Sequence, residues 1–205
     1  MLLGPGRFGD GVRHRPARPR PPPLGRIRRV LMRRRRAVER LAQGGWADGR
    51  SVWEVDDPGR APVVDRVRVG EEPAPERVAR VLDVAGGDAV CVRRRRYVLE
   101  GKPVMLAASY LPAALVAETA VAEIDTGAGG IYARLAEIGC APVRFREEVR
   151  SRMPLPEEAR ELGLPGGTPV VLVCRTAFAD GGRAVEVNEM VLDSAAYVLE
   201  YGFDA

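Results

Sequence analysis

Apolar and polar residues alternate in several segments after residue 50, and this period of two predicts β-strands. The clearest segments read SVWEVDD (51–57), APVVDRVRVGE (61–71) and DAVCVRRRRYVLEG (88–101). Residues 1–25 have no apolar period and are dense in Gly, Pro and Arg, which predicts an extended or disordered basic arm. The pattern therefore divides the chain into a basic head and a body that begins near residue 50.

Between the arm and the body, residues 26–43 show helical spacing. Five apolar residues fall on one helix face, which predicts a short basic linker helix within residues 26–49, and Gly44-Gly45 would end it: Ile27, Val30, Leu31, Val38 and Leu41. The run Arg33, Arg34, Arg35, Arg36 would then surround the helix surface, where arginines contact solvent or phosphates.

The body contains an internal repeat. The segment ARVLDVAGGDAVCVRRRRYVLEG (79–101) aligns without a gap with ARELGLPGGTPVVLVCRTAFADG (159–181). The identical positions include both Gly-Gly pairs, and Arg95 aligns with Arg175. Each copy begins with Pro and Glu, continues through a Gly-Gly turn and a strand, and ends in a hairpin turn. We therefore predict a duplicated unit of helix, strand and hairpin.

The repeat also shows how to interpret the second four-arginine run, Arg93–Arg96. Its counterpart in the second copy, VLVCRT (171–176), is typical of a buried strand. Side chains alternate between the faces of a strand, so Arg93 and Arg95 point one way and Arg94 and Arg96 the other. Arginines that face a covered surface need acidic partners or a ligand anion. An exposed edge strand, whose charges deter aggregation, is the alternative.

Charge is distributed unevenly along the chain. Residues 1–50 hold 14 arginines and three acidic residues, a net charge of +11, whereas residues 51–205 carry a net charge of −7. A basic head on an acidic body is typical of a tail that meets a polyanion such as DNA, although a merely solvated arm is also compatible. No segment is apolar enough to predict a membrane span or a secretory signal.

The numbers of cysteines and histidines limit the kinds of metal, disulfide and catalytic site that the chain can form. The three cysteines contain no CxxC pair and the chain has one histidine, so we expect no metal, no cofactor and no disulfide framework, and a cytoplasmic location. The only histidine, His14, lies in the arm, and no pair of nucleophile and base is visible. We therefore do not expect an enzyme.

The body resembles the UTRA domain, the effector-binding half of GntR-type bacterial transcription regulators of the HutC subfamily. The resemblance rests on VCVRRRRYVLEGKPVMLAASYLP (90–112), GGIYARLAEIG (129–139) and the long block 147–201. It implies an α+β, chorismate-lyase-like fold over residues 50–205, with an antiparallel sheet, packed helices and an internal pseudo-twofold axis. It also implies a homodimer that senses a small, often anionic, effector and controls DNA binding.

The resemblance also implies ligand-binding residues where the family's motifs match. The paired arginines of the first central strand match Arg93 and Arg95, and their guanidinium groups suit planar or tetrahedral anions. The remaining matches are an aromatic residue on the pocket helix, an acid and an amide on a late strand, and a late tyrosine: Tyr132, Glu186, Asn188 and Tyr197.

Two departures from the family pattern bear on the ligand. Gly129-Gly130 stands where many relatives have Ser or Thr, and Ala107 stands where they have Glu. Because these changes remove hydroxyl and carboxylate contacts to sugar phosphates, the sequence favours a smaller or less polar effector.

The head departs from the family as well. A winged helix-turn-helix needs roughly 60–70 residues, and no such pattern is visible before residue 50. The arm resembles the end of a GntR wing, so we expect a missing or truncated DNA-binding domain, with phosphate contacts from Arg33–Arg36. The alternatives are a stand-alone UTRA-like sensor, a lyase-like enzyme on the same fold, and a non-specific polyanion binder.

Overall fold

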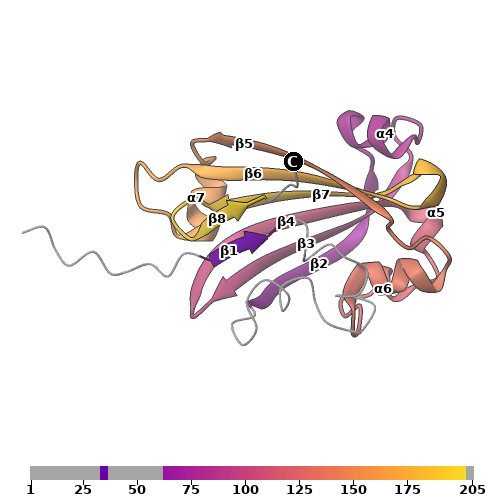
Figure 1. Ribbon diagram of the computed structural model, residues 1–205, viewed down its shortest axis with the longest axis horizontal. Coiled ribbons are helices and arrows are strands. Elements are labelled where there is room, and N and C mark those ends of the chain that lie inside the picture. Colours follow the sequence, from indigo (N-terminus) through magenta and orange to yellow (C-terminus); the bar gives the residue numbers. More distant parts are fainter. Residues whose placement is uncertain (1–32, 37–61, 202–205) are drawn as a thin grey trace, which may run out of the picture.

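A six-stranded antiparallel sheet forms the body of the protein in the computed structural model, which describes residues 33–36 and 62–201 (Figure 1). The strand order is β2-β3-β4-β7-β6-β5. The strands are β2 (Val63–Pro73), β3 (Ala89–Leu99), β4 (Lys102–Pro112), β5 (Arg144–Arg152), β6 (Val170–Phe178) and β7 (Ala184–Asp193). The short helical elements are α4 (Glu76–Leu82), α5 (Ala113–Val116), η1 (Ala120–Ala122), α6 (Gly130–Glu137), α7 (Pro156–Leu162) and η2 (Asp180–Gly182). The α+β architecture expected from the sequence is confirmed.

The predicted repeat is visible in space. α4 and α7 occupy equivalent positions in the two copies, each is followed by two hairpin-connected strands, and β2 and β5 precede them as the two edge strands. β4 and β7 pair at the middle of the sheet, so the two copies are related by a pseudo-twofold axis between these strands. α4 packs against β7 and α7 against β4, so each copy covers the central strand of the other. The duplicated unit predicted from the sequence is confirmed.

Local chemistry defines the ends of both helices. Pro156 opens α7, where a missing N–H costs no hydrogen bond, and the Glu158 side chain accepts a 2.8 Å bond from the backbone N–H of Leu155. α7 ends at Gly163 in the left-handed conformation, at a φ of 60°. The corresponding residue after α4 is Asp83, at a φ of 55°, so the repeat conserves this stop with a different side chain.

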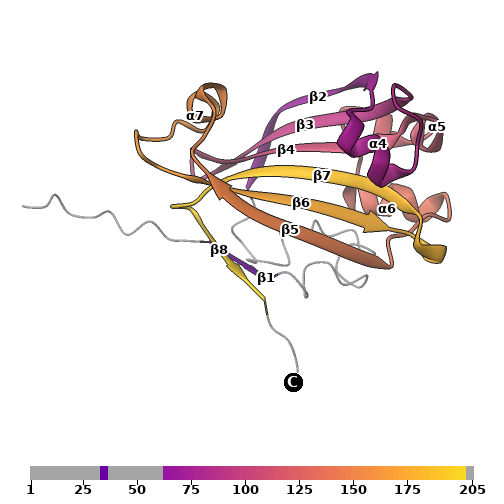
Figure 2. The same ribbon diagram turned by 90° about the horizontal axis from the view of Figure 1, so that it is seen from above.

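The sheet has two different faces. On the helix-bearing face, α4 and α7 lie on the strands, and apolar residues of α4 pack with Val90, Val92, Tyr110 and Val187 (Figure 2). The opposite face, called the open face below, carries two apolar clusters. One cluster lies under α5, η1 and α6 and includes Leu111, Ile131 and Leu135. The other lies under β8 (Tyr197–Glu200) and includes Met105, Met190 and Leu192.

The linker prediction is wrong for Arg33–Arg36. These four residues form strand β1, which pairs in parallel with β8, Arg33 opposite Tyr197 and Arg36 opposite Glu200. Arginine has good helix propensity, but a free strand edge supplies backbone hydrogen bonds that local propensity does not foresee. The rest of the expected linker helix and the expected disordered arm lie outside the described residues, as do Gly44-Gly45 and His14. No described helix is long and apolar enough to cross a membrane.

Candidate functional site

The four arginines of β3 point to alternate faces, as predicted. On the helix-bearing face, Arg94 binds both carboxylate oxygens of Glu72 in β2, with Nη2 2.9 Å from Oε2. Arg96 makes the same kind of two-point contact with Asp65, at 2.9 Å and 2.6 Å. These hydrogen bonds lower the pKa of both carboxyl groups and so keep them charged. The chain itself thus neutralises both arginines of this face.

On the open face, strand register aligns one polar residue from each of five neighbouring strands. Arg93 of β3 lies opposite Ser109 of β4, which lies opposite Asn188 of β7, then Arg175 of β6 and Glu147 of β5. We call these five residues the polar row. The row runs between the two apolar clusters of the face, with Glu186 on one side of it and Arg95 on the other. A polar belt within an apolar surface is the arrangement expected of a ligand site.

Arg93 is tied down by the backbone of another segment. Its Nη1 donates to the carbonyl of Val121 at 2.5 Å and to that of Glu123, and its Nη2 donates to that of Ile124 at 2.9 Å. The residue is only 2% exposed, and burial, followed by the neighbouring Arg95 charge, lowers its pKa. Arg93 therefore fastens the loop after η1 to the sheet, and it does so without a carboxylate.

Arg95 is half-buried and makes a different contact. Its Nη2 donates to the hydroxyl of Ser109, and its Nε has no hydrogen-bond partner although that atom is buried. The residue opposite Arg95 on β4 is Ala107, which is buried in the cluster under β8 and offers no hydrogen-bond acceptor on its side chain. Arg95 is thus a guanidinium group with a donor that has no partner within the described residues.

Arg175 and Glu147 form a buried pair at the other end of the row. Nε of Arg175 donates to Oε1 of Glu147 at 2.9 Å, and Nη2 lies 2.8 Å from the same oxygen. Nη1 of Arg175 donates to the Tyr132 hydroxyl at 3.5 Å. Burial alone would lower the pKa of Arg175, but Tyr132 and Glu147 more than offset it and hold that pKa above its ordinary value.

Tyr132 of α6 lies in the apolar cluster under α5, η1 and α6 and stacks at a tilt on Phe145, with ring centroids 5.3 Å apart. Burial raises its pKa above the ordinary tyrosine value, and the nearby Glu186 carboxylate raises it further. Tyr132 therefore stays neutral and links α6 to both Arg175 and Glu186.

Glu186 and Asn188 are two residues apart on β7 and share the open face. Glu186 is 1% exposed and its Oε2 has no hydrogen-bond partner; Asn188 is 9% exposed and its Oδ1 has none either. A buried acceptor without a donor is uncommon in folded proteins, because its lost hydration is not replaced. These two oxygens are acceptors on the open face that could gain a hydrogen-bond partner from a ligand.

The structure brings five of the six predicted ligand residues together around the polar row: Arg93, Arg95, Tyr132, Glu186 and Asn188. Tyr197 lies apart from Tyr132, in the cluster under β8 with Tyr97 and Met105. Sequence reasoning missed Ser109, Glu147 and Arg175. The repeat carried a signal for Arg175, because the alignment of the two copies places it on Arg95.

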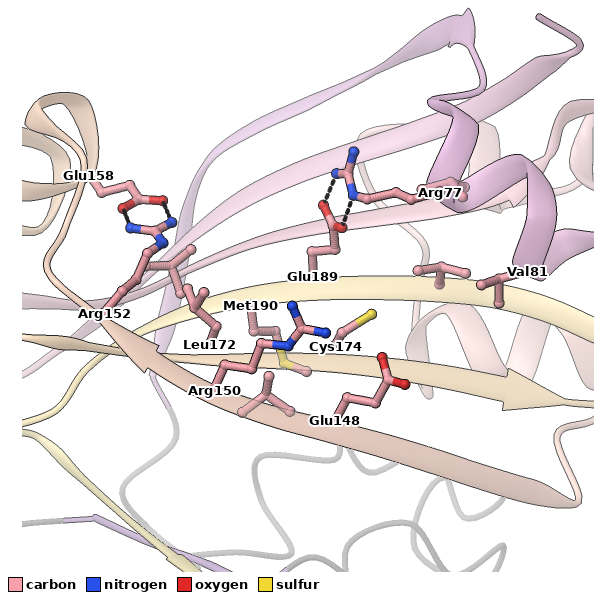
Figure 3. A pocket seen from close by; sticks show the side chains of 14 residues that line it. Arg77, Val81, Glu148, Arg150, Arg152, Glu158, Leu172, Cys174, Glu189 and Met190 are labelled. Atoms are coloured by element: carbon pink, nitrogen blue, oxygen red, sulfur yellow. Dashed lines mark hydrogen bonds and ion pairs between the residues drawn. The ribbon is translucent and has the colours of Figure 1, made fainter. Parts of the chain in front are cut away.

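The helix-bearing face has a groove of its own, between α4, α7 and strands β5 to β7 (Figure 3). Its volume is about 550 Å³ and its lining includes Val81, Leu172 and Cys174. Two ion pairs lie in it: Arg77 with Glu189, at 2.6 Å from Nε to Oε1, and Arg152 with Glu158, at 2.7 Å for both contacts. Among the described residues that line it, none is one of the six predicted ligand residues.

The open face is the better candidate for the ligand site, because several of its buried polar atoms have no hydrogen-bond partner. The groove's ion pairs are complete without a ligand, whereas the open face keeps unpartnered oxygens on Glu186 and Asn188 and an unpartnered Nε on Arg95. Binding energy comes from groups that gain a partner when the ligand arrives, so a ligand gains more on the open face.

Fold and site together define a class of protein: an α+β domain with an internal repeat, whose polar row lies on the sheet face opposite α4 and α7. The chain belongs to the UTRA domain family, whose family model matches residues 57–197. This confirms the resemblance on which the site assignment was based.

One protein similar in sequence and several solved structures are consistent with this family assignment. The chain is 29% identical over 133 residues to the HTH-type transcriptional regulator Rv0792c of Mycobacterium tuberculosis (strain ATCC 25618 / H37Rv), a match that covers 63% of this chain and 48% of the relative. The chain thus spans about half the length of that protein. Among solved structures, PhnF from Mycobacterium smegmatis shares the fold at a TM-score of 0.70 and 22% identity, with 85% of this chain and 72% of that chain covered. The effector domain of PhnF matches at a TM-score of 0.64 and 24% identity, with 72% and 90% covered.

Proposed function

We propose that this chain is the effector-sensing part of a GntR-type transcription regulator of the HutC subfamily, which binds a small anionic metabolite on the open face and thereby controls DNA binding. The family match over residues 57–197 supports a sensing role, and the similarity to one transcriptional regulator favours this role over catalysis. We further propose that the protein acts as a cytoplasmic homodimer.

The observation that carries the proposal is the set of buried polar atoms left unpartnered beside the polar row. We propose that Arg95 contacts the anionic group and that Arg93 holds the loop 121–124 in place around it. Glu186 and Asn188 would bind the rest of the ligand, with Tyr132 packed beside them. Tyr197 would line the far wall, where β8 pairs with β1.

The pairing of β1 with β8 supports a way for ligand binding to affect DNA binding. The backbone of Arg33 lies opposite that of Tyr197, so movement of β8 on ligand binding would be transmitted to the arginine run. Arg33, Arg34, Arg35 and Arg36 remain our candidates for phosphate contacts, without base recognition, while sequence-specific binding would need a helix-turn-helix.

The proposal is tested by the melting temperature of the full chain in the presence of a panel of anionic metabolites. We expect at least one of them to raise the melting temperature, because a ligand that binds only the folded state stabilises it. Arg95→Gln should remove that rise. Arg94→Gln is the matched control, since Arg94 lies next to Arg95 on β3 but on the other face. An equal rise in both variants would show that the anion binds elsewhere.

A further inference from the structure

The charges of the open face do not cancel within the protein in the way those of the helix-bearing face do. Arg175 and Glu147 neutralise each other, and Arg93 directs both of its Nη atoms to backbone carbonyls, while its buried Nε has no partner. Arg93 has no charged partner, but the carbonyls already occupy its Nη atoms. Two further charged groups on this face have no charged partner in a described ion pair: Arg95, which contacts a serine hydroxyl, and Glu186. One is a donor and the other an acceptor.

The unpartnered atoms near Glu186 have one chemistry in common. Oε2 of Glu186 and Oδ1 of Asn188 both accept hydrogen bonds and cannot satisfy each other. A phosphate or carboxylate placed here would add a third acceptor beside a buried carboxylate and would be repelled. A protonated amine offers three donors and a positive charge, so it suits both oxygens.

Arg95 and these acceptors lie on different strands and at different positions along the sheet. Arg95 is on β3 and Glu186 and Asn188 are on β7, with β4 between them. The register places Arg95 level with Met190 of β7 through Ala107, so Asn188 lies two residues and Glu186 four residues from that level along β7. The Arg95 side chain covers part of this distance, because its Nη2 donates to Ser109, which lies opposite Asn188. On β4 this gap is lined by Ser109 and Ala107, which are both small. A ligand that lies beside Ser109 would therefore have Arg95 at one end and Asn188 at the other, with Glu186 beyond Asn188 on the same strand.

We propose that the ligand of the open face is zwitterionic, with its anionic group on Arg95 and a protonated amine, a few bonds away, on Glu186 and Asn188. The ligand class is thus that of an amino acid or a similar aminocarboxylate. This inference rests on the proposed function, because it names the ligand of the same site. It also fits Ala107, since a carboxylate at that position would compete with the ligand's anion for Arg95.

Matched compounds that differ by one amine test the inference on the full chain. The panel comprises glycine, β-alanine, γ-aminobutyrate, δ-aminovalerate and the common α-amino acids, with acetate, propionate, butyrate and valerate as partners that lack the amine, and inorganic phosphate. Isothermal titration calorimetry should find an aminocarboxylate that binds at least about tenfold more tightly than its partner. Glu186→Gln should remove that preference while the weak binding of the plain carboxylate survives, and Arg95→Gln should weaken both.

The melting temperatures of ligand-free variants provide a second test of the zwitterion proposal. Because Oε2 of Glu186 is unpartnered in the free protein, Glu186→Gln should leave the melting temperature unchanged or raise it, whereas Glu147→Gln should lower it. An equal loss in both variants would mean that Glu186 is a structural charge, and the zwitterion proposal would be wrong.

The outcomes separate this inference from the proposed function. If plain carboxylates or phosphate bind as tightly as their aminated partners and depend on Arg95 alone, the face senses an anion and only the zwitterion is refuted. If no compound of the panel binds, or if binding survives Arg95→Gln, the open face is not an anion sensor and the proposed function fails with it.

Discussion

On the helix-bearing face, Arg94 and Arg96 of β3 each grip a carboxylate of β2 with two contacts, whereas Arg93 and Arg95 of the same strand contact carbonyls and a hydroxyl on the open face. The four arginines are consecutive, so the difference arises only from what each face presents. A charge that the chain neutralises itself contributes to the structure and has little left to offer a ligand. A charge beside unpartnered buried atoms retains binding capacity. Four comparisons of variants, from the largest expected effect to the smallest, test this distinction.

The buried pair of Arg175 and Glu147 is the exception on the open face, and breaking it should have the largest effect. Glu147→Gln leaves the Arg175 charge buried without compensation, which should lower the free energy of unfolding by about 3–5 kcal/mol. Urea denaturation measures the loss. Glu148→Gln, one residue along on the other face, is the control and should change stability by less than about 0.5 kcal/mol. Similar values for the two variants would contradict the assignment of a structural pair.

Arg93 should be structural and Arg95 should not, although the two share a face. Arg93→Met leaves the carbonyls of residues 121, 123 and 124 without their donor and should cost about 3 kcal/mol. Arg95→Met gives up one contact to Ser109 and should cost less than about 1 kcal/mol. Both values come from urea denaturation of the ligand-free protein. A larger loss for Arg95 than for Arg93 would reverse their proposed roles.

The Arg152–Glu158 pair on the helix-bearing face should make stability depend on pH. The hydrogen bond from Arg152 lowers the pKa of Glu158 below its ordinary value of 4.5. Because the folded-state pKa of Glu158 is lowered, the ion pair contributes its full stabilisation above the ordinary pKa of 4.5. That contribution disappears as the pH falls through the folded-state pKa. Glu158→Gln should therefore cost about 1 kcal/mol near neutral pH and progressively less below about pH 4. A stability difference that persists in strong acid would show that packing, and not charge, holds α7.

The Arg94–Glu72 pair should matter least, since both side chains are almost half exposed. Exposed pairs contribute little because water and salt screen them, so Glu72→Gln should cost about 0.5 kcal/mol or less at low salt and less still at high salt. Chemical denaturation at two salt concentrations measures both. A loss comparable to that of Glu147→Gln would show that pairing on the helix-bearing face is not a surface effect.

Much of the fold was determined by local sequence features. Alternation of apolar and polar residues predicted β2 and β3, the alignment of 79–101 with 159–181 predicted the repeat, and the strand period placed Arg93 and Arg95 on one face. The strand expected at 51–57 lies outside the described residues. These features hold because side-chain alternation, proline at helix starts and glycine at turns act within a few residues. The same alternation placed Glu186 and Asn188 together, since they lie two residues apart on one strand.

Only the tertiary structure decided which charges are free. The register between strands placed Ser109, Asn188, Arg175 and Glu147 in one row with Arg93, and no local pattern specifies the alignment of strands that are distant in sequence. The strand at Arg33–Arg36 was missed for the same reason, because its pairing partner β8 lies near the opposite end of the sequence. Sequence by itself determined which residues face each side of the sheet. The partners that reach each residue through space determined whether its charge is structural or available to a ligand, because a charge is satisfied by neighbours and not by its own strand.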